Sequence, residues 1–154
     1  MPKINRSPSI AEARAYFEKK KAKVKKTFAD LEGQTRIRTA LAEATNVAHR
    51  LKRYSTWSKQ FDTVADAADV PTSRVDASPH IRLLKYLEIT DKPTSLNRYS
   101  EAIEACLRVH SSREDRREAM IEEGPMTLSA QGAHAKRRLR TRLNTKKRFV
   151  IRKK

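Results

Sequence analysis

Glycine, cysteine and long apolar runs are all scarce in this chain of 154 residues. Three glycines are too few for a sheet protein with many tight turns, or for a glycine-rich phosphate loop. No apolar run approaches the roughly 20 residues that a membrane-spanning helix needs. The single cysteine, Cys106, cannot form a disulfide within the chain, which is typical of a reducing compartment. These absences favour a helical, cytoplasmic protein.

Patterns of catalytic or metal-binding residues are missing from the sequence as well. No two of its four histidines, and no histidine and cysteine, have the spacing of zinc ligands: His49, His80, His110 and His134. No Walker, Rossmann, G-x-S-x-G or H-E-x-x-H pattern occurs. We therefore expect no enzyme activity, cofactor, metal or small-molecule substrate. We interpret Cys106 as a small core residue and the histidines as surface or capping residues, and we expect no secretion because no apolar segment follows the basic start.

Positive charge is what the sequence has in excess. Lys and Arg number 35 against 18 Asp and Glu, so the formal net charge is +17 and the pI is near 10.4. Residues 136–154 hold eleven basic and no acidic side chains, and residues 1–33 carry a further net charge of +5. A solvated, solubility-enhancing tail is one interpretation, but self-repulsion has no benefit there, so we favour a polyanionic partner.

Apolar residues at helical spacing predict an all-α protein, a small bundle of about six to seven helices. Ser9 with Glu12, and Ser112 with Asp115, have the spacing of helix N-caps, while Gly33 is a candidate C-terminal cap. The predicted helices cover about 9–31, 35–53, 56–70, 79–87, 95–109, 112–123 and 127 onward. We divide the chain into a basic N-terminal arm (1–33), a helical core (34–125), and a basic C-terminal helix with its tail (126–154).

Both ends supply candidate contacts to phosphates. Lysines surround the N-terminal helix, and burying unpaired ammonium groups costs several kcal/mol each, so we expect this helix to protrude into solvent or lie against a polyanion. Its candidate residues are Lys19, Lys20, Lys21, Lys23, Lys25 and Lys26. The candidates at the other end are Lys136, Arg137, Arg138, Arg140, Arg142, Lys146, Lys147, Arg148, Arg152, Lys153 and Lys154. Arginine predominates up to residue 142, and its guanidinium group can bind phosphate through two parallel hydrogen bonds.

A short central segment, residues 64–75, carries a second candidate. Its small Ala65, its turn-former Asp69 and its apolar Val70 lie at positions that resemble the first helix and turn of a LacI-type helix-turn-helix. Asp69 stands where that motif usually has glycine, and Pro79 would interrupt the recognition helix.

The resemblance implies a groove-facing set made of Thr72, Ser73 and Arg74. The alternative is that residues 64–70 form the end of an ordinary core helix, which Pro71 stops. Tyr54 and Tyr86, each beside a basic residue, are further candidates for stacking on unpaired bases.

Together these observations predict a non-catalytic protein that binds the phosphate backbone of nucleic acid through its basic ends, largely independently of sequence. DNA is favoured over RNA because of the helix-turn-helix resemblance, and a nucleoid, replication or packaging role fits. One alternative is a subunit of a larger nucleoprotein assembly such as a viral coat or ribosome-associated protein. In that case its partners would include copies of itself or other proteins, and it would lie in a virion or nucleus if the source is viral or eukaryotic. A helix-turn-helix regulator using 64–78 and a module for an acidic protein are others, whereas we expect no membrane partner.

Overall fold

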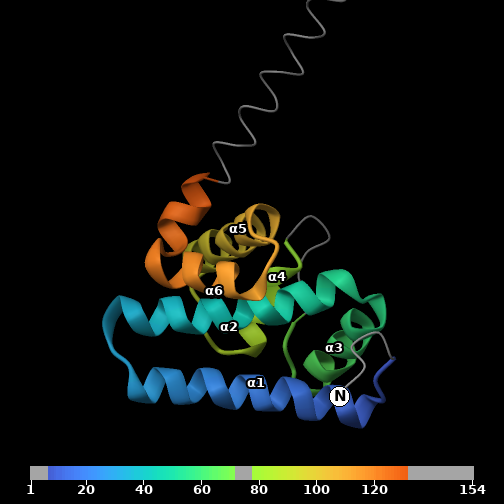
Figure 1. The fold of residues 1–154 in the computed structure, drawn as a ribbon. Helices are drawn as coiled ribbons and strands as arrows, with labels where there is room; N and C mark the ends of the chain where they lie inside the picture. Colours follow the sequence, from blue (N-terminus) through green and yellow to red (C-terminus); the bar gives the residue numbers. More distant parts are fainter. Residues whose placement is uncertain (1–6, 72–77, 132–154) are drawn as a thin grey trace, which may run out of the picture.

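The computed structural model describes residues 7–71 and 78–131 of the chain, and every regular element in these ranges is helical (Figure 1). The fold is therefore all-α, as predicted. Six helices have both ends within the described ranges: α1 (Ile10–Asp30), α2 (Gly33–Arg53), α3 (Ser55–Ala67), α4 (His80–Tyr86), α5 (Pro93–Val109) and α6 (Arg113–Glu122). A further helical stretch begins at residue 125 and is described as far as residue 131.

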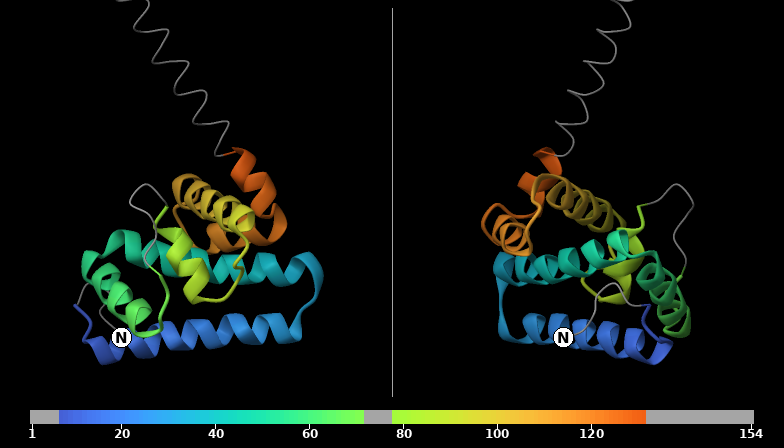
Figure 2. Two further views of the ribbon diagram at one scale, coloured as in Figure 1. Left: turned by 180° about the vertical axis from the view of Figure 1, so that it is seen from behind. Right: turned by 45° about the vertical axis from the view of Figure 1, so that its right-hand side comes forward.

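The central element of the bundle is α2, which contacts all five of the other named helices. It runs antiparallel to α1 on one side and packs against α5 and α6 on the other, while α4 crosses it opposite α6 (Figures 1 and 2). The small side chains of Ala40, Ala44 and Ala48 are fully or almost fully buried, and they let the neighbouring helices approach its backbone closely. Residues 125–131 lie on the side of the bundle away from α1 (Figure 1).

Aromatic rings connect α1, α3 and α4. Phe17 of α1 meets Trp57 and Phe61 of α3 edge to face, with ring centroids 6.0 and 5.1 Å apart. Tyr86 of α4 packs edge to face against Phe61 at 5.6 Å. These pairs each add about 0.5–1.5 kcal/mol beyond the burial of apolar area, so the N-terminal half of α1 is held firmly in the bundle.

The predicted helix starts are confirmed at both serine caps. The hydroxyl oxygen of Ser9 accepts a hydrogen bond from the Glu12 amide, and that of Ser112 accepts one from the Asp115 amide, each at 3.1 Å. Gly33 is not the C-terminal cap of α1, because α1 ends at Asp30 and Gly33 opens α2 instead. Gly124 does end α6, at a φ of +86° where a Cβ atom would lie 2.7 Å from Arg38 Nε.

The N-terminal helix does not protrude as predicted. Phe17 is fully buried and Val24 is 1% exposed, so the apolar stripe of α1 forms part of the common core with α2 and α3. The prediction failed because it treated every lysine of this helix as unpaired, and several have carboxylate partners on other elements. No described helix is long and apolar enough to cross a membrane.

Cys106 and His80 are both buried, which confirms one prediction and contradicts the other. Cys106 is a core residue, as predicted, and its burial raises the pKa of its thiol to about 11. His80 is not a surface residue, since it is 6% exposed and its Nε2 lies 2.7 Å from a carboxylate oxygen of Glu104. Sequence spacing contained no sign of this pair, because the two residues belong to different helices, α4 and α5.

Candidate nucleic-acid interface

Only some of the lysines predicted to meet phosphates on α1 are available to do so. Lys19, Lys25 and Lys26 are exposed. Lys21 lies 3.4 Å from the Glu88 carboxylate and also packs over the ring of Tyr86, 5.2 Å from its centroid. Tyr86 itself is 2% exposed, so it is not available as a platform for unpaired bases.

Lys20 and Lys23 form ion pairs with a buried carboxylate. The Nζ atoms of both lie 3.2 Å from Oε1 of Glu43, a residue of α2 that is 1% exposed. Burial raises the pKa of Glu43, but the two ammonium groups lower it more, and the net shift is downward. Glu43 is thus a charged group between α1 and α2, and its two lysines stabilise the packing of these helices.

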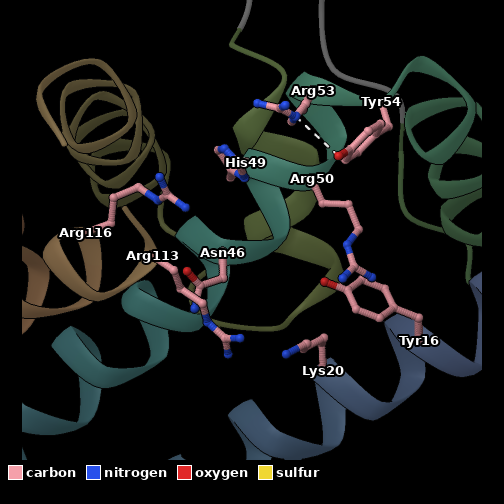
Figure 3. A pocket seen from close by; sticks show the side chains of 9 residues that line it. All are labelled: Tyr16, Lys20, Asn46, His49, Arg50, Arg53, Tyr54, Arg113 and Arg116. Atoms are coloured by element: carbon pink, nitrogen blue, oxygen red, sulfur yellow. Dashed lines mark hydrogen bonds between the residues drawn. The ribbon is translucent and has the colours of Figure 1, made fainter. Parts of the chain in front are cut away.

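The described chain also contains a cationic pocket that the sequence did not predict (Figure 3). It has a volume of about 370 Å³ and lies between α1, the C-terminal half of α2 and the first turn of α6. We call it the arginine pocket. Its lining holds five basic residues and no Asp or Glu, and consists of Tyr16, Lys20, Asn46, His49, Arg50, Arg53, Tyr54, Arg113 and Arg116.

Aromatic rings orient two of its arginines. The guanidinium carbon of Arg50 lies 4.1 Å from the ring centroid of Tyr16 and 4.9 Å from that of Trp57. Arg53 donates from Nε to the Tyr54 hydroxyl at 3.2 Å (Figure 3). Ring contacts hold the Arg50 guanidinium, and one hydrogen bond from Nε holds that of Arg53, so the Nη donors of both remain for a ligand.

The inner wall of the arginine pocket contains polar atoms without partners. Arg116 is 4% exposed and donates from Nη1 to the carbonyl oxygens of His110 and Ser111, at 3.4 and 2.7 Å. Its Nε has no hydrogen-bond partner among the described residues, and neither Nδ2 nor Oδ1 of Asn46 has one. Buried polar groups are almost always hydrogen-bonded, so these three atoms are exceptions, and a rotation of the Asn46 or Arg116 side chain would be needed to give them a partner.

Ionisation in the pocket reflects both its burial and its positive charge. Burial lowers the pKa of His49, and the nearby Arg116 and Arg53 lower it further, which favours the neutral imidazole at neutral pH. Burial raises the pKa of Tyr16, so its phenol stays protonated. The pocket therefore offers cationic and neutral hydrogen-bond donors, which suits an anion.

The helix-turn-helix resemblance is only partly represented in the described residues. Asp69 has a φ of +59°, the left-handed conformation that the turn requires, and Val70 packs against the core as an apolar plug. The next described helix, α4, begins at His80, and five of its seven residues are buried. It therefore presents no exposed face to a DNA groove. The candidate base-reading residues Thr72, Ser73 and Arg74 lie outside the described residues, as do all candidates from Lys136 to Lys154.

The pocket was missed because its residues are far apart in the sequence. Periodicity indicates which face of each helix is buried, but not which faces meet, and positions 16, 50 and 113 belong to three different helices. One local signal existed: basic residues recur three positions apart in Arg50–Arg53 and in Arg113–Arg116. Tyr54, predicted as a stacking platform, does lie at this pocket.

Comparison with known proteins adds no relative. No family model, curated protein or solved structure matches this chain. Among the described residues, no group of His, Cys, Asp and Glu could hold a metal ion.

Proposed function

We propose that this protein is a non-catalytic nucleic-acid-binding protein that holds the phosphate backbone largely independently of sequence. The arginine pocket is the observation that carries the proposal: five basic residues line it, and no carboxylate does. Arginine is the residue best suited to phosphate, because its planar fork matches two phosphate oxygens at once. The exposed lysines of α1 and the eleven basic residues of 136–154 would extend the contact along the strand.

Binding would take place in the cytoplasm, on the nucleoid or in a nucleoprotein particle. The preference for DNA over RNA depends on the helix-turn-helix resemblance, whose candidate base-reading residues lie outside the described residues. Backbone contacts do not by themselves distinguish the two nucleic acids. The experiment below therefore includes both.

Fluorescence anisotropy with duplexes of arbitrary sequence, in DNA and RNA versions, tests the proposal. We expect removal of residues 136–154 to weaken binding far more than Arg74→Ala does. A triple variant, K19Q/K25Q/K26Q, is expected to bind more weakly than the matched triple K59Q/K92Q/R117Q, which removes the same charge elsewhere. Between 50 and 200 mM salt, a protein that contacts six to ten phosphates loses affinity by a factor of about 10³–10⁵.

Three results would overturn the proposal. A salt profile that stays flat would mean that few phosphates are neutralised on binding. A sequence-specific complex that survives the deletion, with Arg74 essential, would identify a groove-reading protein instead. A partner that remains attached after nuclease treatment of a cell extract would identify an acidic protein as the ligand.

A further inference from the structure

We propose that the arginine pocket binds the phosphorylated end of a nucleic-acid strand, through the terminal phosphate, in preference to phosphates within the strand. This inference rests on the proposed function and assigns a specific ligand to one part of the surface. It depends on the charge of the pocket, its unpartnered polar atoms and its concave shape.

The charge of the pocket favours a terminal phosphate over an internal one. An internal phosphodiester carries one negative charge, whereas a terminal phosphate monoester carries about −1.5 to −2 at pH 7. Five basic residues line the pocket, and one of them, Lys20, already shares the charge of Glu43. Four arginines remain without a carboxylate in the lining, namely Arg50, Arg53, Arg113 and Arg116. A multiply charged phosphate balances this set better than a singly charged one.

The number of donors in the lining also favours a terminal phosphate. A terminal phosphate has three oxygens that are free to accept hydrogen bonds, against two in a diester. Donors reach the pocket from three helices: Lys20 from α1, Asn46 and Arg50 from α2, and Arg113 from α6 (Figure 3). The unpartnered Arg116 Nε and Asn46 Nδ2 are buried within the lining residues, and they can reach an anion only when their side chains rotate toward the pocket. An anion that enters the pocket can therefore be held by several helices at once.

The shape of the pocket also favours a strand end. The pocket is a concavity of about 370 Å³ and not a groove along one helix, so a strand that continues in both directions fits it poorly. A strand end can enter with its phosphate first. Tyr54 then offers a ring on which the terminal base can stack. His49 of α2 also lines the pocket, and its neutral imidazole would gain a proton more easily beside a dianion.

Single-stranded oligonucleotides of one sequence test the proposal by fluorescence anisotropy. They carry a 5′-phosphate, a 3′-phosphate or no phosphate, and an unphosphorylated strand two nucleotides longer controls for added charge. We expect one phosphorylated form to bind at least about tenfold more tightly than this charge-matched strand, the effect of one charge-assisted hydrogen bond. Arg113→Gln should remove most of that preference, while Arg117→Gln, an exposed residue of α6 outside the pocket lining, should keep it.

The outcomes separate this inference from the proposed function. If all strands bind but the phosphorylated ones gain nothing over the charge-matched control, the inference is overturned and the proposed function stands. The same conclusion follows if the preference survives Arg113→Gln. If pyrophosphate binds the wild type and not the Arg113→Gln variant, while strand ends make no difference, the pocket takes a free polyphosphate and the inference is overturned. If no strand binds at all, both proposals fail.

Discussion

Glu104 shows how single residues in this protein acquire properties that their own position in the sequence does not predict. Its carboxylate accepts a hydrogen bond from Lys52 Nζ at 2.9 Å and lies 2.7 Å from Nε2 of the buried His80. Burial raises the pKa of Glu104, but the hydrogen bonds from His80 and Lys52 outweigh it and hold the pKa at about 2. Three helices, α2, α4 and α5, thus meet at one carboxylate.

The pKa of Glu104 predicts acid sensitivity. Because its ordinary value is 4.5 and its folded value is about 2, the folded state binds fewer protons than the unfolded state between these values. Its contribution to stability is therefore complete above pH 4.5 and is lost as the pH falls toward 2. We expect the free energy of unfolding, measured with urea at several pH values, to fall more steeply in the wild type than in Glu104→Gln.

Comparing the wild type with Glu104→Gln cancels the effects of other titrating groups on stability at low pH. The lowered pKa of His49 also destabilises the fold below about pH 6.5, but equally in both proteins, so it cancels in their difference. At pH 7 the variant should be less stable by about 1–2 kcal/mol. Parallel pH profiles for the two proteins would show that the contacts of Glu104 with His80 and Lys52 do not stabilise its ionised form in the folded state.

At the scale of helices, the two serine caps form a natural comparison. Ser9 caps α1 at a distance from the arginine pocket, whereas Ser112 caps α6 directly before Arg113, which lines it. Replacing either serine with alanine should cost about 1 kcal/mol of stability, because one helix amide loses its hydrogen bond.

The functional consequences of the two substitutions should differ. We expect Ser112→Ala to loosen the first turn of α6 and weaken pyrophosphate binding several-fold, measured by titration calorimetry, while Ser9→Ala leaves it unchanged. If Ser112→Ala and Ser9→Ala change the affinity for pyrophosphate equally, the assignment of this ligand to the arginine pocket is wrong.

At the scale of the whole molecule, the arginine pocket exists only when α1, α2 and α6 are packed together. Folding brings like charges close to one another there, which costs free energy unless an anion is bound. The same positive charges would bind an anion in the folded state. Stability and binding are therefore expected to oppose each other in this part of the protein.

Arg113→Gln tests this opposition. In chloride buffer we expect the variant to be more stable than the wild type by about 0.5 kcal/mol, since a repelling charge at an exposed position is removed. Pyrophosphate should raise the melting temperature of the wild type above that in chloride of equal ionic strength, because it binds the folded state alone. The variant should lose most of that increase.

Arg117→Gln is the matched control and should behave like the wild type toward pyrophosphate. Loss of stability in Arg113→Gln would contradict the repulsion argument. If pyrophosphate raises the melting temperature of the wild type no more than chloride does, the arginine pocket is not an anion-binding site.

The sequence by itself determined the helical fold and where several helices begin and end. The serine caps act on neighbouring amides, and apolar spacing marks the buried face of each helix, so both signals can be read without knowing which distant residues are in contact. The excess of positive charge and the core position of Cys106 were also predictable, because composition and periodicity contain them.

Only the tertiary structure decided which charges are neutralised and which gather. Lys20 and Lys23 are bound to Glu43 because α1 packs against α2, and this pairing turned a helix predicted to protrude into part of the bundle. Arg50 and Arg113 line one pocket because α2 packs against α6. Charge interactions act through space and depend on a few ångströms of separation, a distance that linear spacing along separate helices does not specify.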